Sequence, residues 1–446
     1  MLKQLPLPSC LSKFARDDTG SVLIMTALLS PLVMAGLGLG VETGHWYQKQ
    51  RQLQHISDLA SHAAASRLRN GDSNSAIYVS ALTIAKGSGF EFDLGSMEFH
   101  SPPTSGTYAG NSEAVEVILT ENRPRWFTGM FMNGDVELKA RSVSLINGGS
   151  PACILALSNT ASGAVTVTGS TDIGLTNCVV TSNSAATDAF SMNSGASYMT
   201  TDCVHTVGGA VYTSNLTLTD CSAPRTMQPR TRDPYADRSE PVVWGSCSNG
   251  RIGRPNASTT VSATDSHPSG MQSKRFCGGL TLKGNVTFEP GLYIVDGGTF
   301  SINSQAVISN QLGGVTFFLT NGAEIHFNGG STIDLAAPTS GPTSGMLFWE
   351  SKYSSSYSGG HSGCGGGSSS GTTSHIFNGG SDMNLEGAIY MPVSDVTFNG
   401  GANAQNGCTQ VVADTIRLSG NSNLSVSCEN AGTENILASE SVNVVE

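Results

Sequence analysis

The strongest hydrophobic pattern in the chain is an apolar run near its beginning. No charged side chain occurs from Thr19 to Val41, and the stretch SVLIMTALLSPLVMAGLGLGV is almost entirely apolar apart from Ser, Thr and Gly. A helix needs about 20 such residues to cross the hydrocarbon core of a bilayer. We therefore predict a transmembrane helix from Ser21 to Val41, within a segment of residues 20–41, preceded by a cytoplasmic segment of residues 1–19.

The alternative for this run is a cleaved secretory signal, because Lys3, Lys13 and Arg16 precede it. The run is longer than the apolar part of such signals, no clear A-x-A cleavage site follows it, and a helical pattern continues beyond it. These features favour an uncleaved anchor. A second helix pattern covers residues 42–70, and we expect it to extend the membrane helix as a stalk. Its apolar residues recur at helical spacing: Trp46, Leu53, Ile56, Ala60, Ala63 and Ala64.

Residues 71–150 alternate between apolar and polar positions and predict a small α/β or β domain. The alternating sets are Phe90, Phe92 and Leu94, then Val115, Val117 and Leu119, then Val136, Leu138 and Ala140. Between the last two sets, RPRWFTGMF predicts a short helix with Trp126 and Phe127 as core anchors. The segment shows no catalytic constellation.

From residue 151 onward the chain repeats itself. TVTGSTDIGLTNC ends at Cys178, SMNSGASYMTTDC at Cys203 and SNLTLTDC at Cys221, which gives intervals of 25 and 18 residues. The tetrapeptide FNGG also recurs, and its phenylalanines are Phe327, Phe377 and Phe398. Repeats of 20 to 50 residues are typical of stacked structural units.

Each FNGG copy stands between two short alternating segments, which predicts strand, bend, strand. Asn-Gly and Gly-Gly allow the backbone conformations that a sharp bend requires. We interpret the phenylalanine as a core residue and the following Asn-Gly-Gly as the bend, so the motif is structural and not a ligand signature. The predicted turn residues are Phe327, Asn328, Gly329, Gly330, Phe377, Asn378, Gly379, Gly380, Phe398, Asn399, Gly400 and Gly401.

These patterns together predict a mainly β fold. After the transmembrane helix, stalk and small domain, residues 151–446 are expected to form a right-handed parallel β-helix, a β-solenoid, with inserts at 222–276 and 351–374. The alternative is a set of β-sandwiches, which would favour hairpin turns at closer spacing.

The N-terminal segment resembles the TadE/TadG-like proteins of the tight-adherence (Flp) pilus-assembly system. The resemblance covers about 55 residues and rests on Arg16-Asp17 before Gly20, the apolar helix, an acidic residue just past it, and a run in the stalk: Glu42, Arg51, Leu53, Gln54, Asp58, Ala60, Ala63 and Ala64. It implies a membrane-bound role in pilus assembly. Members cut by prepilin peptidase carry Glu five residues after the processing Gly, whereas this chain has Met25 there, which favours retention in the membrane.

Larger relatives of the TadG type carry a von Willebrand A domain with an Asp-x-Ser-x-Ser metal motif, which this sequence lacks. The order CILALS, DPYADRSEP, GVTFFLTNG, LAAPTSG and GAIYMP instead resembles the extended outer region of a subset of membrane-anchored relatives, across most of residues 151–401.

Composition excludes one class of partner. Only 13% of the residues are charged, and from Cys277 onward three basic residues (Lys283, Lys352, Arg417) stand against 13 acidic ones, so that this part has a net charge of 3 − 13 = −10. Nucleic-acid binding needs clustered Lys and Arg. We therefore expect no nucleic-acid partner. The stretch APRTMQPRTRDPYADRSEP is the one local basic cluster; it could bind an anionic glycan or lipid, but its prolines and acidic residues favour a connector between two parts of the solenoid.

Scattered cysteines indicate the compartment. Cys10 precedes the apolar run, nine cysteines follow it, and no C-x-x-C pair occurs. This pattern predicts an oxidising compartment, up to four disulfides and no metal site or other cofactor. The disulfide candidates are Cys153, Cys178, Cys203, Cys221, Cys247, Cys277, Cys364, Cys408 and Cys428.

Parallel β-helices often carry polysaccharide hydrolases or lyases, so an enzyme at the cell envelope is the alternative function. A lyase needs a base and cations, which are sparse here. A glycosidase needs two carboxylates about 5 to 9.5 Å apart. The candidates are Asp334, Asp382, Glu386, Asp395 and Asp414, of which Asp334 and Asp382 follow their FNGG turns at comparable positions.

The sequence thus favours a non-enzymatic protein of pilus assembly or surface attachment. We expect a single-pass protein of the bacterial inner membrane with a cytoplasmic N-terminus and a periplasmic or extracellular body. Its expected partners are the membrane, other tight-adherence pilus components, and cell wall or glycan.

Overall fold

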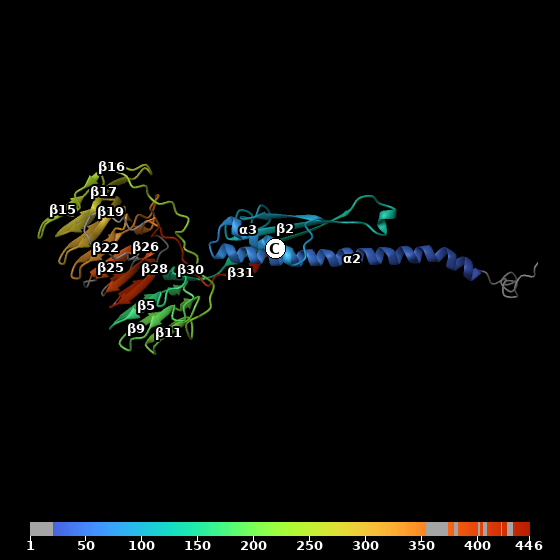
Figure 1. Cartoon of the computed structure of the whole chain (residues 1–446), viewed down its shortest axis with the longest axis horizontal. Coiled ribbons are helices and arrows are strands. Elements are labelled where there is room, and N and C mark those ends of the chain that lie inside the picture. The colour runs from blue at the N-terminus through green and yellow to red at the C-terminus, as the bar shows by residue number, and fades with distance from the viewer. Residues whose placement is uncertain are drawn as a thin grey trace, which may run out of the picture. The chain divides into compact units, whose positions relative to one another are not determined.

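The computed structural model describes residues 21–353, 373–378, 382–399, 402–404, 408–420, 422–425 and 431–446. They form two compact units (Figure 1). Unit 1 comprises Met1–Leu68, Asp72–Ile146 and Val442–Glu446, and unit 2 comprises Arg69–Gly71 and Asn147–Ser441. The prediction of a mainly β fold with a long apolar helix near its beginning is confirmed.

Helix α2 spans Ser21–Arg69 without interruption, and its two parts have different surroundings. In the first part, every large apolar side chain from Val22 to Val41 is at least 44% exposed. In the second part, Leu53 and Ile56 are buried against a sheet. α2 is therefore long and apolar enough to cross a membrane, while its second part belongs to a folded domain and is not a free stalk.

The sheet of unit 1 has the strand order β1-β2-β3-β31. Its strands are β1 Gly95–His100, β2 Ala114–Arg123, β3 Val136–Asn147 and β31 Ser441–Val444. The alternating residues Val115, Val117 and Leu119 of β2 are buried in one core with α2 and with α3, which spans Asn74–Gly87. The sheet is antiparallel from β1 to β3, as expected for strands with one covered face.

Two expectations for this domain were wrong. Phe90, Phe92 and Leu94 do not form a strand, because α3 extends to Gly87 and the turn after it returns Phe90 to the helix end, where its N–H donates to Ala85. Trp126 is not a core anchor. It lies in the β2–β3 connection and is 58% exposed, and the short 3-10 helix η1 there covers only Thr128–Met130.

Unit 2 consists of many short strands. The first group is β4 Ser150–Ala156, β5 Val165–Thr168, β6 Asp172–Thr176, β7 Val179–Ser182, β8 Phe190–Met192, β9 Tyr198–Thr201, β10 Val204–Thr206, β11 Ala210–Tyr212 and β12 Leu216–Leu218. The second group is β13 Cys247–Ser248, β14 Arg251–Ile252, β15 Ser258–Val261, β16 Asp265–Ser266, β17 Gln272–Leu282, β18 Asn285–Phe288, β19 Gly291–Ile302, β20 Val307–Asn310, β21 Val315–Thr320, β22 Glu324–Phe327, β23 Thr332–Ala336, β24 Met346–Glu350, β25 Ser374–Asn378, β26 Asp382–Asn399, β27 Ala402–Ala404, β28 Thr409–Ser419, β29 Ser422–Ser425 and β30 Leu437–Ala438.

Parallel pairing joins strands three positions apart in the chain. β4 pairs with β7 and β7 with β10, β5 with β8 and β8 with β11, and β6 with β9 and β9 with β12. We call three consecutive strands of this kind a rung. Its strands occupy the first, second and third strand positions, as β4, β5 and β6 do. In the second group the long strands β17, β19, β26 and β28 each cover two or three positions of a rung.

The order of the rungs differs from the order of the chain. Along the first strand position the neighbours are β13, β17, β19, β21, β24, β26, β28, β4, β7 and β10. The chain therefore enters the stack in its middle at β4, runs to one end at β10–β12, restarts at the other end at β13, and returns to the middle at β28. Figure 1 shows the orange and red strands β26 and β28 continuing into the green strand β5.

Residues 222–246, here called the strap, join the two ends of this stack and lie over its first strand position. Tyr235 of the strap is buried with outward-facing residues of that position, among them Ile294, Trp349 and Tyr390. Because both faces are covered, strands such as β21 and β24 are buried at every residue. The predicted insert of residues 222–276 thus includes the strap, β13 to β16 and the start of β17.

Candidate functional site

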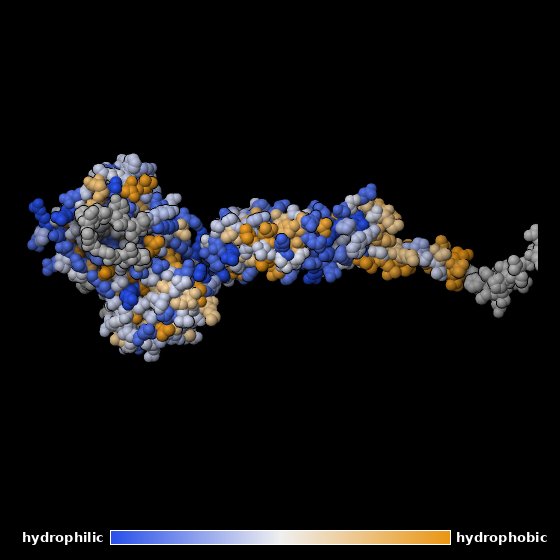
Figure 2. All heavy atoms as spheres, viewed as in Figure 1, coloured by the Kyte–Doolittle hydropathy of each residue, from blue (hydrophilic) through white to orange (hydrophobic). Residues whose placement is uncertain are grey.

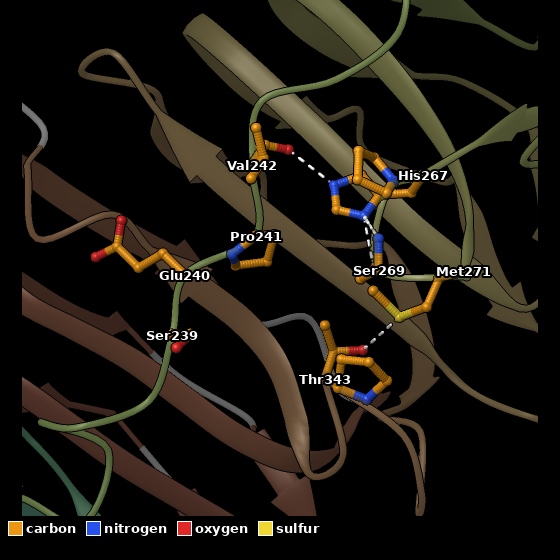
Figure 3. Close-up of a pocket in the computed structure, with 10 residues that line it drawn as sticks. Ser239, Glu240, Pro241, Val242, His267, Ser269, Met271 and Thr343 are labelled. Carbon is orange, nitrogen blue, oxygen red and sulfur yellow. Dashed lines mark hydrogen bonds between the residues drawn. The ribbon is translucent and has the colours of Figure 1, made fainter.

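The strap also borders a pocket of about 320 Å³ (Figure 3). It is lined by the strap, by the turn between β16 and β17, and by the loop between β23 and β24. The lining residues are Ser239, Glu240, Pro241, Val242, His267, Pro268, Ser269, Met271, Pro342 and Thr343. Three prolines, Val242 and Met271 make the pocket largely apolar, which is typical of a binding cavity.

The polar groups of the pocket already have partners. Nε2 of His267 donates to the Val242 carbonyl at 2.9 Å, and Nδ1 accepts the N–H of Ser269 at 3.1 Å. Both ring nitrogens of His267 therefore have hydrogen-bond partners. Glu240 accepts the Ser351 hydroxyl and the Lys352 N–H, both at 2.7 Å, and in Figure 3 its carboxylate points away from His267. The pocket can therefore hold a small apolar group, but it offers no free acid or base.

The strap is fixed by buried polar contacts. The Tyr235 hydroxyl donates to Gln410 at 2.7 Å, and the Tyr390 hydroxyl donates to Asp233 at 2.9 Å. Burial raises the pKa of Asp233 despite hydrogen bonds that lower it. Farther along the strap, Arg238 lies over the Trp349 ring at 5.8 Å. Arg238 thus serves packing, whereas Arg225 and Arg230 of the same basic cluster are exposed.

A buried cluster of Glu350, His375 and Ser394 has the residue types of a hydrolytic triad. Their geometry is different, because the Ser394 hydroxyl donates to Glu350 at 2.6 Å instead of to the imidazole. Nδ1 of His375 accepts the N–H of Ile325 at 3.2 Å, and Nε2 is 3.5 Å from the same carboxylate. All three are at most 1% exposed. The cluster is therefore closed to solvent. No local sequence pattern indicates it, because its residues are far apart in the chain.

The carboxylates that the sequence raised as glycosidase candidates are not paired as expected. In the register of β23 and β26, Asp334 is opposite Asn384, and Asp382 is opposite Thr332. The two positions are therefore offset, because Asp334 is the seventh residue after its phenylalanine and Asp382 only the fifth. The Asn384 amide donates to Asp334 at 2.9 Å. Glu386 is opposite Ala336, and Asp395 is opposite Thr415, whose hydroxyl donates to it at 2.6 Å.

Among these carboxylates, Asp414 lies near a second one. Burial, followed by the negative charge of Asp395, raises the pKa of Asp414. Among the residues that the structure describes, no group of three His, Cys, Asp or Glu side chains is arranged to hold a metal ion.

The FNGG phenylalanines lie in one row across neighbouring rungs. Phe327, Phe377 and Phe398 are opposite one another in register, are at most 1% exposed, and have ring centroids 5.3 and 4.9 Å apart. Next to them, the Asn399 amide donates to Asn378 at 2.9 Å. In the first copy Asn328 is exposed and Gly330 has φ of +87°. Gly379, Gly380, Gly400 and Gly401 are outside the described residues.

Six of the nine candidate cysteines form three disulfides: Cys153–Cys178, Cys203–Cys221 and Cys247–Cys277. Cys408 is disulfide-bonded as well. Cys364 and Cys428 lie outside the described residues, as do residues 1–19, Gly20 and most of the predicted insert at 351–374. Each of the three bridges connects neighbouring rungs, so the repeated Thr-Asn-Cys and Thr-Asp-Cys endings mark inter-rung links.

A second site of interest lies in unit 1, at the end of the exposed apolar part of α2, here called its bare part, which runs from Val22 to Val41. Glu42 is 1% exposed, and its carboxylate accepts the N–H groups of Trp126 at 2.6 Å and Thr128 at 2.8 Å. Burial raises the pKa of Glu42, but the hydrogen bonds from the β2–β3 connection outweigh it and the net shift is downward. The sequence identified Glu42 by resemblance, but could not identify the distant backbone that it binds.

Comparison with known proteins gives one match. Residues 20–67 match the family model Tad, described as Flp pilus-assembly TadE/G-like. No curated protein and no solved structure matches the chain. The match ends within α2, so it covers the bare helix, Glu42 and the helix face that packs on the sheet. The chain therefore contains a TadE/G-like segment at residues 20–67.

Proposed function

We propose that the protein is a non-enzymatic, membrane-anchored component of tight-adherence (Flp) pilus assembly or surface attachment, and that it acts by binding. The observation that carries this proposal is the coincidence of two features in α2. The TadE/G-like match covers residues 20–67, and the same helix presents a bare apolar face from Val22 to Val41. Such a face is costly in water and favourable in a bilayer.

We place the protein in the bacterial inner membrane, with a cytoplasmic N-terminus and a periplasmic or extracellular body. Lys3, Lys13 and Arg16 precede the apolar run, which accords with the excess of basic residues on the cytoplasmic side. The disulfides of unit 2 favour an oxidising compartment for the body.

We also infer that the rungs of unit 2 wind as a right-handed parallel β-helix. Parallel pairing at a separation of three strands supports a solenoid, and connections between parallel strands of one sheet are nearly always right-handed. A stack of this kind is rigid and presents long sheet faces. Its partners in this proposal are other pilus components, with cell wall or glycan as further candidates.

The hydrogen bonding, burial and spacing of the polar side chains favour binding over catalysis. His267 and Glu240 at the pocket have hydrogen-bond partners, the Glu350 cluster is sealed, and Asp334 is offset from Asp382. A hydrolase remains the competing function. Hydrolysis of an exopolysaccharide by the purified protein, lost on the change Asp334→Asn, would replace our proposal.

The proposal is tested by deleting the gene and restoring it in four forms. The wild-type chain should restore piliation and attachment. A form in which residues 22–41 are replaced by an unrelated apolar sequence should stay in the membrane. If this form also restores piliation and attachment, the segment acts only as an anchor. The change Met271→Lys places a charge in the strap pocket and tests whether the pocket binds a partner; Leu312→Lys, at a 99% exposed position, is its control. Normal piliation and attachment in the deletion strain would refute the role.

A further inference from the structure

The connection between β2 and β3 is unusually apolar for an exposed turn. Residues 124–135, here called the hairpin tip, contain four large apolar side chains that face solvent. Trp126 is 58%, Met130 75%, Phe131 75% and Met132 56% exposed. Isolated exposed apolar residues are common, but four of them within seven positions form a patch, and a patch of this kind indicates an interaction surface.

The hairpin tip is held against α2 at the end of its bare apolar part. The Glu42 carboxylate binds the N–H groups of Trp126 and Thr128. One turn earlier, Gly38 lies so close to the Phe127 ring that a Cβ at this position would be 2.5 Å from Cδ2. Gly38 thus allows the tip to approach the helix, and the contacts fix the level of the tip between residues 38 and 42.

This level coincides with a membrane boundary, provided that α2 spans the bilayer as proposed above. The apolar run ends at Val41, and four residues of helix rise only about 6 Å, so the tip and the end of the run lie at nearly the same depth. Figure 2 shows hydrophobic atoms both on the bare part of α2 and around the hairpin tip beside it.

The chemistry of the hairpin tip suits the interface between lipid and water. Trp126 stacks on His45 at 4.5 Å, and the Arg125 guanidinium lies 5.6 Å from the Trp46 ring, so aromatic rings and a cation occur together here. Trp is enriched at the level of lipid headgroups because its ring is apolar and its N–H is polar. Met130, Phe131 and Met132 would then reach the acyl boundary.

We propose that the hairpin tip inserts into the outer lipid interface as a second membrane contact. The helix alone leaves a single-pass protein free to tilt and rotate. A second contact at the level of Glu42 restrains both motions, because the tip is bound to one side of α2. The occupant of the apolar patch is thus the lipid surface itself, and the patch is continuous with the apolar face of the spanning helix.

The test uses the full chain reconstituted in phosphatidylcholine vesicles that contain lipids brominated near the headgroup end of the acyl chain. Brominated lipids quench tryptophan only on close approach. The chain has four tryptophans, and Trp244, which is 46% exposed on the strap, provides the control. We expect Trp126→Phe to remove most of the quenchable emission and Trp244→Phe to leave it unchanged.

A second pair of variants tests insertion without removing the probe. Phe131→Asp should lift the tip and reduce quenching of Trp126, whereas Met227→Asp, at an 88% exposed position of the strap, should have no effect. If quenching is the same in the wild type, Trp126→Phe and Phe131→Asp, the tip lies in water and the inference is wrong. Extraction of the wild-type chain by alkaline carbonate would instead refute the anchor, and with it both proposals.

Discussion

The Glu42 carboxylate accepts hydrogen bonds from the backbone N–H groups of Trp126 and Thr128. Among the described residues, these two N–H groups donate to no other acceptor. Removing the carboxylate leaves these donors without their partner in a partly buried position, which adds to the loss of the bonds themselves. Glu42→Ala should therefore release the hairpin tip and raise amide hydrogen exchange at Trp126 and Thr128. Exchange at Phe99 and His100 of β1, which are opposite Val117 and Glu116 at the end of β2 away from the tip, should not change. Equal exchange at the tip in both proteins would show that Gly38 and Phe127 hold it without Glu42.

His205 predicts a dependence of stability on pH in unit 2. Burial, followed by the positive charge of Arg225, lowers its pKa from 6.5 to about 4. Below pH 6.5 the unfolded chain binds a proton that the folded chain does not, so stability falls as the pH falls and levels off near pH 4. The difference should be on the order of 2–3 kcal/mol.

This prediction is checked by urea unfolding at pH 7, 5.5 and 4. His205→Gln should remove most of the dependence between pH 6.5 and 4, and His55→Gln, at an exposed position of α2, should retain it. The same change in the free energy of unfolding with pH in the wild type and in His205→Gln would contradict the assignment of this dependence to His205.

Among single residues, the sequence predicted inward-facing positions better than polar contacts. Phe327 and Val115 could be identified because alternation along one strand determines which face is buried. Trp126 was misassigned, because an apolar residue in a turn gives no indication of whether it faces the core or a membrane. Glu240 and Tyr235 were not identified, since their partners are more than 100 residues away in the chain.

At the level of elements, the phenylalanine row makes the second-position strands interdependent. Phe377 packs edge-to-face against Phe327, stacks on Phe398, and has no exposed surface. Phe377→Ala should lower the free energy of unfolding by about 3–5 kcal/mol, while Phe377→Leu keeps most of the volume and should cost less than about 1.5 kcal/mol. Denaturant titration followed by tryptophan fluorescence measures both. Leu312→Ala, at an exposed site, should stay within about 0.5 kcal/mol of the wild type.

The disulfides secure the two ends of the stack separately. Cys203–Cys221 lies next to the end formed by β10–β12 and closes an 18-residue separation, and Cys247–Cys277 joins β13 to β17 at the other end. Closing a loop of this size contributes about 3 kcal/mol. Replacing Cys203 and Cys221 by Ser should raise hydrogen exchange in β10–β12 and leave β13–β15 unchanged.

Replacing Cys247 and Cys277 should give the reverse pattern, which makes each variant the control of the other. If hydrogen exchange rises uniformly along the whole stack in either variant, the two disulfides do not stabilise the two ends separately.

Strands were the most predictable elements, because alternation and turn residues are local signals. The helix α3 was not predicted, although Ser73 caps it and Ile77, Ala81 and Ala85 recur at helical spacing. Its β-branched Ile, Val and Thr residues weaken the helical signal. The pairing of β28 with β4 is a contact between the last and first rungs, and no local pattern encodes it.

For the whole molecule, this late pairing predicts how unit 2 depends on its final strands. The rung of β4–β6 stacks on β28 and β29 on one side and on β7–β9 on the other. A chain ending at Asn399 lacks β28 and should leave β4 and β5 open along that side, although Ile154 and its partner Val411 are 257 positions apart in the sequence. Limited proteolysis should then cut within residues 152–156 of β4, which are buried in the full chain. Unchanged protection would show that β4–β12 fold independently.

The strands of unit 2 follow β3 and precede β31 in the chain, and β3 and β31 belong to the sheet of unit 1. Within unit 2, the first and last strands are antiparallel neighbours, with Leu437 opposite Pro151. Tension applied to the stack is therefore divided between two covalent connections that leave it side by side. A pull shared in this way loads β3 and β31 together, and these two strands are neighbours in the sheet of unit 1.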